Sequence, residues 1–350
     1  MVEMLDLKEF KRRYQKVPVE EYPNRVRETV PDPLLTVHLI TYNHAGYIRQ
    51  AIESVLMQEV DFPMEIVLGD DDSSDGTREI CIEYAEKYPD VIRLQLHHRE
   101  NNRRLYGRPT HLFQYWYNTL SARGKYIAPL SGDDCWTDTC KVQKQISFLE
   151  SNNEYSLTHH NAVVVRGDGE VKRGEYFPKT KEKDISGEDL VQAPVVVASS
   201  VVVRNVLSEI PKRFMSVLYE DRMITSLLGL YGKGKYFCET MSVYRKHKNG
   251  IHKSTDKSTK YKDYSDYLRA IEEIICKSKK CTRKIKRKKI EIREKRYINM
   301  IERKMFRKSI NVAIKVVIKY IKINKPKKAF IWTIKSIRYM LGKVKRSYIT

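Results

Sequence analysis

The chain has 350 residues and a formal net charge of +22, and this charge is unevenly distributed. Residues 271–350 contain 27 Lys and Arg but 5 Asp and Glu, whereas residues 1–270 contain 39 basic and 39 acidic residues. The excess positive charge therefore belongs to the C-terminal part, which argues against a nucleic-acid-binding protein whose whole body is basic. A neutral globular unit with a cationic extension is predicted instead.

The composition also indicates in which cellular compartment the protein is expected. Six cysteines without a Cys-x-x-Cys pair predict reduced thiols, as in cytosolic proteins. The N-terminal segment MVEMLDLKEFKRRYQK has no apolar core, so we expect no secretory signal. No run of about 18 apolar residues occurs, so no membrane-spanning helix is expected either.

Segments typical of strands and helices alternate from residue 34 onward. The proline-rich residues 1–33 predict a helical lead-in followed by an extended linker. Short apolar runs predict strands at residues 34–41, 63–69, 91–97 and 124–130. Helical spacing of apolar residues predicts helices at residues 45–58, 75–88, 109–121 and 138–149, with Asp75 as the N-cap of the second. The alternation predicts a doubly wound, mostly parallel α/β sheet.

The alternation weakens after residue 150. Strands are expected at residues 155–166, 195–204, with a break at Ser199 and Ser200, and 235–244. A charged loop or hairpin is expected at residues 167–186, a helix at residues 215–230 and a polar loop at residues 246–258. We therefore predict three parts: a lead-in (1–33), a globular domain (34–270) and a basic helical tail (271–350).

Polar clusters follow three of the predicted strands. They are Thr41–His44, Asp70–Asp75 and Ser131–Asp134. In a doubly wound sheet these strand ends meet at one edge, where ligands bind. The carboxylates would repel one another, and a divalent cation with a diphosphate would relieve this repulsion. Helix-capping turns without any ligand are the alternative for both acidic clusters.

Four segments, taken in order, resemble the family 2 glycosyltransferases, which are inverting nucleotide-sugar enzymes with the GT-A fold. They are TVHLITYNHAGYIRQAIESVLMQ, EIVLGDDDSSDGT, GKYIAPLSGDDCWTDTCKVQKQISFLE and MSVYRKHKNGIH. The resemblance covers residues 34–252, is to the bacterial surface-polysaccharide type, and does not extend to the basic tail. It implies that residues 34–270 form a GT-A catalytic domain.

The resemblance implies a donor-binding site after the first two strands. Thr41, Tyr42 and Asn43 would line the pocket for the nucleotide base, with Tyr42 stacked on uracil or a similar base. Asp70 would accept a hydrogen bond from the base, and Asp71 is the weaker candidate for that contact.

The resemblance also implies a metal site for Mn²⁺ or Mg²⁺. Asp133 and Asp134 would hold the metal and the ribose–diphosphate part of the donor, with His247 as a further ligand and His252 as its alternative. The family motif usually opens with an acidic residue, and Ser131 stands in that place here. We therefore assign the metal to the two aspartates and expect no contribution from Ser131.

An inverting transfer needs a base that deprotonates the acceptor hydroxyl on the face opposite the leaving diphosphate. Asp221 occupies the place of the family's catalytic Asp, and Glu220 is the alternate. An acid that merely stabilises a helix N-terminus is the competing interpretation of this pair.

The basic tail combines cationic and apolar faces. In residues 310–323, Lys315, Lys319 and Lys322 form one stripe beside a large apolar surface, and residues 328–344 repeat the pattern. Such helices suit an anionic lipid interface, so residues 276–350 predict peripheral attachment to the inner face of the cell membrane. Packing on the catalytic domain or on a second copy, as in a homo-oligomer, is the alternative, and nucleic acid is not expected.

The sequence thus predicts a cytoplasmic, metal-dependent, inverting glycosyltransferase. It would transfer a hexosyl or N-acetylhexosaminyl group from a UDP-linked donor to a hydroxyl of a cell-surface glycan or lipid-linked acceptor. Two alternatives remain: a catalytically weak scaffold or sugar-binding subunit of the same fold, and a membrane-binding interaction protein whose tail is its main function.

Overall fold

The computed structural model describes residues 3–166, 170–176, 183–191, 196–247, 257–274, 289–295, 314–318, 328 and 331–333. The chain forms two compact units, Met1–Gly250 and Ile251–Thr350. The predicted domain boundary at residue 270 differs from this division, because helix α10 (Lys257–Ile274) belongs to the second unit.

The second unit is helical where it is described. Besides α10, residues 289–295 and 314–318 are in helical segments. Among the helices that the structure describes, none is both long enough and apolar enough to cross a membrane.

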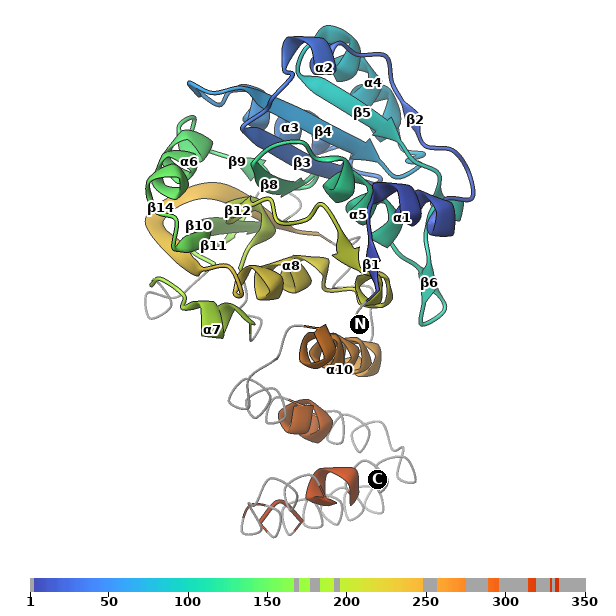
Figure 1. Ribbon diagram of the computed structural model, residues 1–350, viewed down its shortest axis with the longest axis vertical. Coiled ribbons are helices and arrows are strands. Elements are labelled where there is room, and N and C mark those ends of the chain that lie inside the picture. The colour runs from blue at the N-terminus through green and yellow to red at the C-terminus, as the bar shows by residue number, and fades with distance from the viewer. Residues whose placement is uncertain are drawn as a thin grey trace. The chain divides into compact units, whose positions relative to one another are not determined.

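The first unit is built on one mixed sheet with the strand order β2-β5-β4-β3-β8-β12-β10-β14-β9 and with β11 paired to β10. Four parallel strands form its centre: β5 (Ile92–Leu96), β4 (Met64–Asp70), β3 (Leu35–Thr41) and β8 (Tyr126–Ser131). Figure 1 shows these strands side by side. The predicted parallel α/β arrangement is confirmed, and each strand lies within two residues of its predicted bounds.

Helices cover both faces of this centre. Helices α3 (Ile48–Leu56), α4 (Thr77–Lys87) and α6 (Lys141–Ser151) share one core with alternate strand residues such as Leu39 and Leu68. Helix α5 (Leu112–Ser121) lies on the opposite face, where Tyr115 contacts His38. Successive strand residues point to opposite faces. In β3, Leu35, Val37 and Leu39 therefore join the core, whereas the intervening Thr36 and His38 are buried on the other face.

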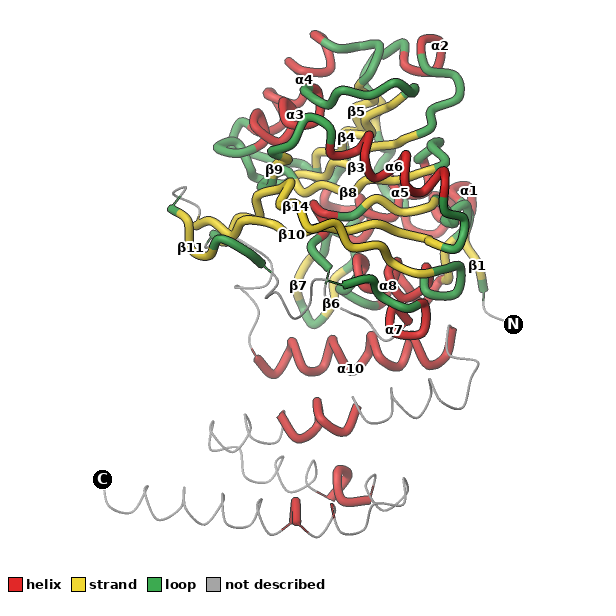
Figure 2. The backbone as a smooth tube through the Cα atoms, turned by 90° about the vertical axis from the view of Figure 1, so that its left-hand side faces the viewer, coloured by secondary structure: helices red, strands yellow, loops and turns green. Residues whose placement is uncertain are grey.

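The second half of the sheet brings the C-terminal strand of the unit beside the centre. Strand β10 (Tyr155–Arg166), whose bounds equal the prediction, pairs in parallel with β14 (Lys233–Lys246). Figure 2 shows the two strands side by side. Strand β9 (Cys135–Trp136) pairs antiparallel with β14, and β12 (Val202–Arg204) lies between β8 and β10. Strand β14 therefore ends close to the loop between β8 and β9.

Smaller elements complete the unit and correct two expectations. They are β11 (Val171–Arg173), α7 (Gly187–Val191), β6 (Arg104–Leu105), β7 (Arg108–Pro109), η1 (Arg99–Asn101), η3 (Ala198–Ser200), β13 (Ile210–Pro211) and η4 (Lys212–Ser216). The break expected at Ser199 and Ser200 is confirmed as η3, but the strand expected at residues 195–204 is shorter, because β12 spans only Val202–Arg204. The helix expected from residue 215 begins later, as α8 (Glu220–Leu228), because the chain first forms η4.

The N-terminal lead-in is part of the first unit. It contains β1 (Met4–Leu5), the predicted helix as α1 (Leu7–Tyr14), then β2 (Glu20–Glu21) and α2 (Val26–Thr29). Strand β2 pairs antiparallel with β5, and β1 pairs with β13. The segment expected to be an extended linker therefore adds an edge strand to the sheet.

A buried ion cluster fixes the amino ends of the central strands. The fully buried carboxylate of Glu65 lies 2.6 Å from Arg123 and 3.3 Å from Arg93, and it accepts a 2.8 Å hydrogen bond from Thr36. Removing one partner of a buried ion pair costs about 3–5 kcal/mol of stability, because it leaves an uncompensated charge in the interior. This cluster is placed at the end of the strands opposite to the polar loops.

Candidate active site

Three loops leave the sheet at the same edge because their strands are in register. The first loop follows β3, the second follows β4 and the third follows β8. Thr41 pairs with Asp70 across β3 and β4, and Ile40 pairs with Ser131 across β3 and β8. The three polar clusters of the sequence therefore begin level with one another, at the carboxyl edge where doubly wound sheets bind ligands.

The first two loops are fastened to each other by hydrogen bonds from backbone N–H groups to side-chain oxygens. The bonds run from Asn43 to Ser73 (2.9 Å), from His44 to Thr77 (2.8 Å), from Ala45 to Asp75 (3.1 Å) and from Ser74 to Asn43 (3.0 Å). Asn43 and Asp72 have left-handed φ values of 52° and 64°, which Asn and Asp tolerate better than most residues. These four hydrogen bonds between the two loops, called the interlock below, fix the position of His44.

The predicted N-cap at Asp75 is wrong. Helix α4 is capped by Gly76, whose φ of 97° suits a residue without a side chain. The Asp75 carboxylate instead accepts hydrogen bonds from Thr77 and from Ala45 of the neighbouring loop, so it serves the interlock.

Arginines compensate the carboxylates of the second loop. Asp70 lies 2.6 Å from Arg78, and Asp71 lies 2.7 Å from Arg99. The expected repulsion in this loop is thus relieved by side chains of the protein. The Oδ1 atom of Asp70 is buried and has no hydrogen-bond partner within the part of the chain that the structure describes. Because buried acceptors are rarely left unpaired, this atom is a candidate for accepting a bond from a ligand.

Tyr42 is the exposed aromatic ring of the first loop, with 37% of its surface accessible. The Arg99 guanidinium lies 3.9 Å from the ring centroid and also pairs with Asp71, which accepts a further bond from Asn102. Burial, opposed by Arg99 and Asn102, raises the pKa of Asp71 to about 7. An aromatic face beside two acidic acceptors is chemically suited to a nucleobase.

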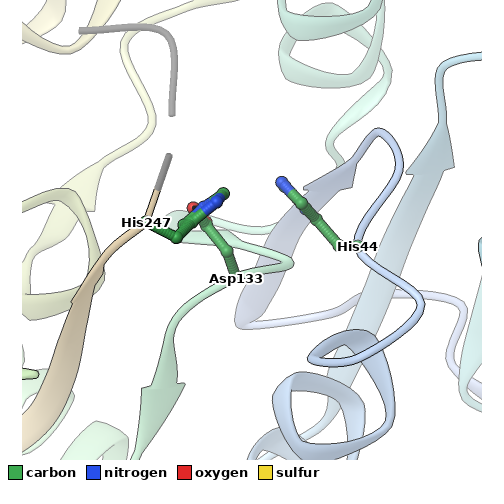
Figure 3. Close-up of side chains that lie close together, drawn as sticks. All are labelled: His44, Asp133 and His247. Carbon is green, nitrogen blue, oxygen red and sulfur yellow. Dashed lines mark hydrogen bonds and ion pairs between the residues drawn. The ribbon is translucent and has the colours of Figure 1, made fainter. Parts of the chain in front are cut away.

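Three side chains from separate elements form a candidate metal site. Ligand atoms of His44, Asp133 and His247 all lie within 4.8 Å of one another, and Figure 3 shows these side chains pointing toward one another. His247 Nε2 is 2.8 Å from Asp133 Oδ2. His44 follows β3, Asp133 follows β8 and His247 follows β14, so the sheet topology brings the group together.

The protonation states of this group favour metal binding. Burial raises the pKa of Asp133, but the hydrogen bond with His247 and the nearby His44 outweigh it and lower the value to about 2. Burial lowers the pKa of His44. An ionised carboxylate and a neutral imidazole are the forms that coordinate metals, and two imidazoles with one carboxylate suit transition metals better than Mg²⁺.

Asp134, predicted as a metal ligand, does not join this group. It is buried, and its Oδ1 accepts a 2.9 Å hydrogen bond from the backbone N–H of Arg245. Burial and the neighbouring Asp133 raise its pKa well above the usual range. Ser131, expected to contribute nothing, forms a hydrogen bond with Asp133. The fallback ligand His252 lies outside the described residues.

Arg245 holds the loop of Asp133 against β14. Its guanidinium donates a 2.8 Å hydrogen bond to the Asp133 carbonyl and another to Gln50 of α3, and it lies 5.3 Å from the Tyr47 ring. Because His247 follows Arg245 at the end of the same strand, these contacts position the imidazole over Asp133.

The two acids predicted as base candidates stand in the first turn of α8 and face different surroundings. Asp221 lines a largely apolar pocket together with His38, Tyr115 and Thr225. Glu220 instead engages His111, with Oε1 2.5 Å from the imidazole Nε2. The structure thus separates the two candidates, leaving Asp221 as the one that borders a pocket.

Two histidines of this region were not singled out from the sequence. His44 lies in the first polar cluster, so its place after a central strand was a usable signal for a metal ligand. His111 lies before α5 with no motif around it, and its pairing with Glu220 spans 109 positions, so no local signal marks it.

Comparisons with known proteins agree with this arrangement. The family model described as glycosyl transferase family 2 matches residues 36–209. The uncharacterized protein Rv1520 of Mycobacterium tuberculosis is 33% identical over 220 residues, which are 62% of this chain and 60% of that protein. The match therefore spans less than two thirds of that relative's length.

Two solved structures share the fold at low identity. TarS of S. aureus (residues 1–349, with UDP) has a TM-score of 0.58 and 15% identity, covering 90% of both chains. The mannosyltransferase PcManGT of Pyrobaculum calidifontis, solved with GDP-Man and Mn²⁺, has a TM-score of 0.51 and 14% identity, covering 98% of this chain and 90% of that one. The fold is that of the GT-A enzymes, and residues 36–209 form a glycosyl transferase family 2 domain.

Proposed function

We propose that this protein is a metal-dependent, inverting glycosyltransferase that uses a UDP-linked sugar and a hydroxyl of a cell-surface glycan or lipid-linked acceptor. The observation that carries the proposal is the His44–Asp133–His247 group, which lies at the same sheet edge as Tyr42 and the acidic second loop. The structures of TarS with UDP and of PcManGT with GDP-Man and Mn²⁺ support a nucleotide-sugar donor and a divalent metal.

In this proposal the first two loops bind the nucleotide. The base stacks on the exposed ring of Tyr42, and the buried carboxylate of Asp70 or Asp71 accepts a hydrogen bond from it. Thr41 and Asn43 hold the loop: the Thr41 carbonyl accepts from the Asp71 N–H, and Asn43 bonds to the second loop. Their contribution is to keep Tyr42 and Asp71 adjacent before the donor arrives.

In the proposed complex, the His44–Asp133–His247 group would bind the metal that accompanies the diphosphate of the donor. Asp133, His247 and His44 would hold a divalent ion, and such an ion would supply Lewis-acid stabilisation of the charge that develops on the departing diphosphate. The three side chains already converge, and the Asp133 carboxylate is ionised. Binding of the metal therefore requires no proton to leave Asp133. The two imidazoles favour Mn²⁺ over Mg²⁺.

Asp221 takes the proton from the acceptor hydroxyl in this mechanism. Asp221 lines the pocket to which α5 and α8 both contribute. The hydroxyl then attacks the anomeric carbon from the face opposite the diphosphate, so the configuration inverts. General-base assistance of this kind contributes about 10²–10⁴-fold to the rate.

A thermal-shift panel of nucleotide sugars tests the function. We expect a UDP-sugar with Mn²⁺ to raise the melting temperature more than the GDP- and ADP-sugars do, because a ligand at 100 times its Kd stabilises the folded state by about 2.7 kcal/mol. Mn²⁺-dependent hydrolysis of the same donor confirms turnover. A flat panel would instead favour the scaffold or sugar-binding alternative.

The proposed membrane attachment concerns residues 276–350. In the described part of this segment, Ile314, Ile318 and Ile331 are exposed, and the exposed Lys315 lies in the same helical segment as the first two. Exposed apolar side chains interspersed with lysine suit the surface of an anionic bilayer. We infer that the tail brings the enzyme to a lipid-linked acceptor on the inner face of the membrane.

Vesicle co-sedimentation of the full chain tests this attachment. We expect binding to anionic phosphatidylserine vesicles at low salt, weaker binding to phosphatidylcholine and loss at high salt, since each basic residue contributes about 1 kcal/mol. Replacing Lys315, Lys319 and Lys322 by glutamate should weaken binding. The charge-matched control replaces the exposed Lys8, Lys87 and Lys233. Equal loss in both variants, or a dimer without vesicle binding, would favour packing of the tail on protein.

A further inference from the structure

His111 joins the beginnings of two helices beside the pocket. It is the residue before α5, and its Nε2 atom lies 2.5 Å from Oε1 of Glu220, the first residue of α8. Both side chains are largely buried, with 14% and 13% of their surface exposed. A contact of this kind between charged groups is strong, because little water screens it.

Acidic groups from two further positions face the same imidazole. Asp221 approaches it from α8 and Asp71 from the loop after β4, while Tyr115 stands one turn along its own helix. Burial lowers the pKa of His111, but Glu220, with help from Asp71 and Asp221, outweighs it and raises the value above 6.5. Asp71 also pairs with Arg99, so Glu220 is the acid bonded directly to His111.

The contact between His111 and Glu220 affects where the neighbouring Asp221 side chain lies. Within the described residues, Oε2 of Glu220 is buried without a hydrogen-bond partner, so Oε1 and its contact with His111 fix this side chain. Asp221 is the next residue in the same helical turn, and it lines the pocket. Movement of the first turn of α8 would therefore move the carboxylate of the proposed base.

We propose that His111 is a positioning residue for the transfer reaction: its ion pair with Glu220 holds the first turn of α8 and so aligns the Asp221 carboxylate. The inference rests on the proposed function, in which Asp221 takes the acceptor proton. It assigns Glu220 to alignment and leaves Asp221 as the base. The ion pair is complete when the imidazole is protonated and is lost as the pH rises and the imidazole loses its proton.

Kinetics of three variants from about pH 6 to about pH 9 test the proposal across the range where imidazole titrates. His111→Gln keeps a donor for Glu220 and cannot titrate, whereas His111→Phe removes the donor. His98→Gln is the matched control, because His98 lies outside the helix pair in the segment between β5 and η1. The quantities measured are kcat and the donor KM.

We expect the kcat of the wild type to fall on the alkaline side and His111→Gln to lose this fall. His111→Phe should lose about 10²-fold in kcat with the donor KM nearly unchanged, since a misplacement of about 1 Å can cost this much. Rescue by Gln but not by Phe separates alignment from a general folding defect. An alkaline fall that persists in His111→Gln, or a kcat for His111→Phe equal to that of His98→Gln, overturns the proposal.

An NMR titration of the histidine rings tests the pair without any donor. The His111 signal is assigned by its absence in His111→Gln, and we expect its midpoint above 6.5 in the wild type and lower in Glu220→Gln. A midpoint unchanged by Glu220→Gln overturns the proposal. Absence of turnover with every donor overturns the proposed function and the alignment role that rests on it, but leaves this midpoint where it is, so the two failures are distinguishable.

Discussion

Replacing Asp221 by asparagine is expected to lower turnover by about 10²–10⁴-fold while the dissociation constant of the donor stays close to the wild-type value. Asparagine keeps the shape of the side chain but cannot accept the acceptor's proton. Asp221 lines the pocket to which α5 and α8 contribute, whereas the residues proposed to bind the nucleobase lie in the first two loops. Single-turnover transfer and equilibrium donor binding measure the two effects separately.

Glu220→Gln is the matched control for this variant, because it removes the neighbouring carboxylate from the same helical turn. Glu220 is bonded to His111, so we expect a smaller loss of kcat with an altered pH profile. If Glu220→Gln abolishes transfer while Asp221→Asn retains it, the two roles are reversed and Glu220 is the base.

Replacing Asp133 by asparagine is expected to weaken Mn²⁺ binding by more than about 100-fold, the upper end of the effects of changing outer-shell partners of a metal. Asp133 supplies the carboxylate of the three-residue group and holds its charge near neutral pH. Mn²⁺ binding is measured calorimetrically or by electron paramagnetic resonance without donor, and Mn²⁺-dependent transfer should fall in parallel.

Two further variants sharpen this test. His44→Asn removes one imidazole, so it should weaken Mn²⁺ binding less than Asp133→Asn does and reduce the preference for Mn²⁺ over Mg²⁺. Asp134→Asn should leave Mn²⁺ affinity near the wild-type value, because Asp134 bonds to the backbone of Arg245. A loss in Asp134→Asn as large as in Asp133→Asn would restore Asp134 as a ligand.

Much of the fold could be predicted from the sequence because apolar periodicity reports burial directly. The central strands carry buried apolar residues at alternate positions, such as Leu35, Val37 and Leu39 of β3, and the bounds of β10 equal the prediction. The start of α8 was placed too early because the apolar residues Phe214 and Met215 are buried through η4, not through a helix continuous with α8. Strand β2 was missed because the Glu20–Glu21 pair carries no apolar signal.

The site was only partly accessible from the sequence. The resemblance brought Asp133 and His247 together, and the structure places them 2.8 Å apart. The resemblance could not tell which of the two adjacent aspartates joins the metal group. That depends on the backbone N–H of Arg245, which lies on a strand far along the chain and binds the Asp134 carboxylate. Nor could it show that Arg78 and Arg99 neutralise the second loop, since both pairings arise only in the folded chain.

The ion cluster around Glu65 has a consequence for how the sequence of the protein can change in evolution. It secures the amino ends of the same strands whose carboxyl ends carry the loops of Tyr42 and Asp133. Substitutions near Glu65 should reduce the yield of folded protein, and what does fold should keep its specific activity. Substitutions in the loops should change the specific activity and leave the yield of folded protein unchanged. Separate ends of one scaffold can thus diverge independently, so new substrate preferences can arise without rebuilding the part that keeps the chain folded.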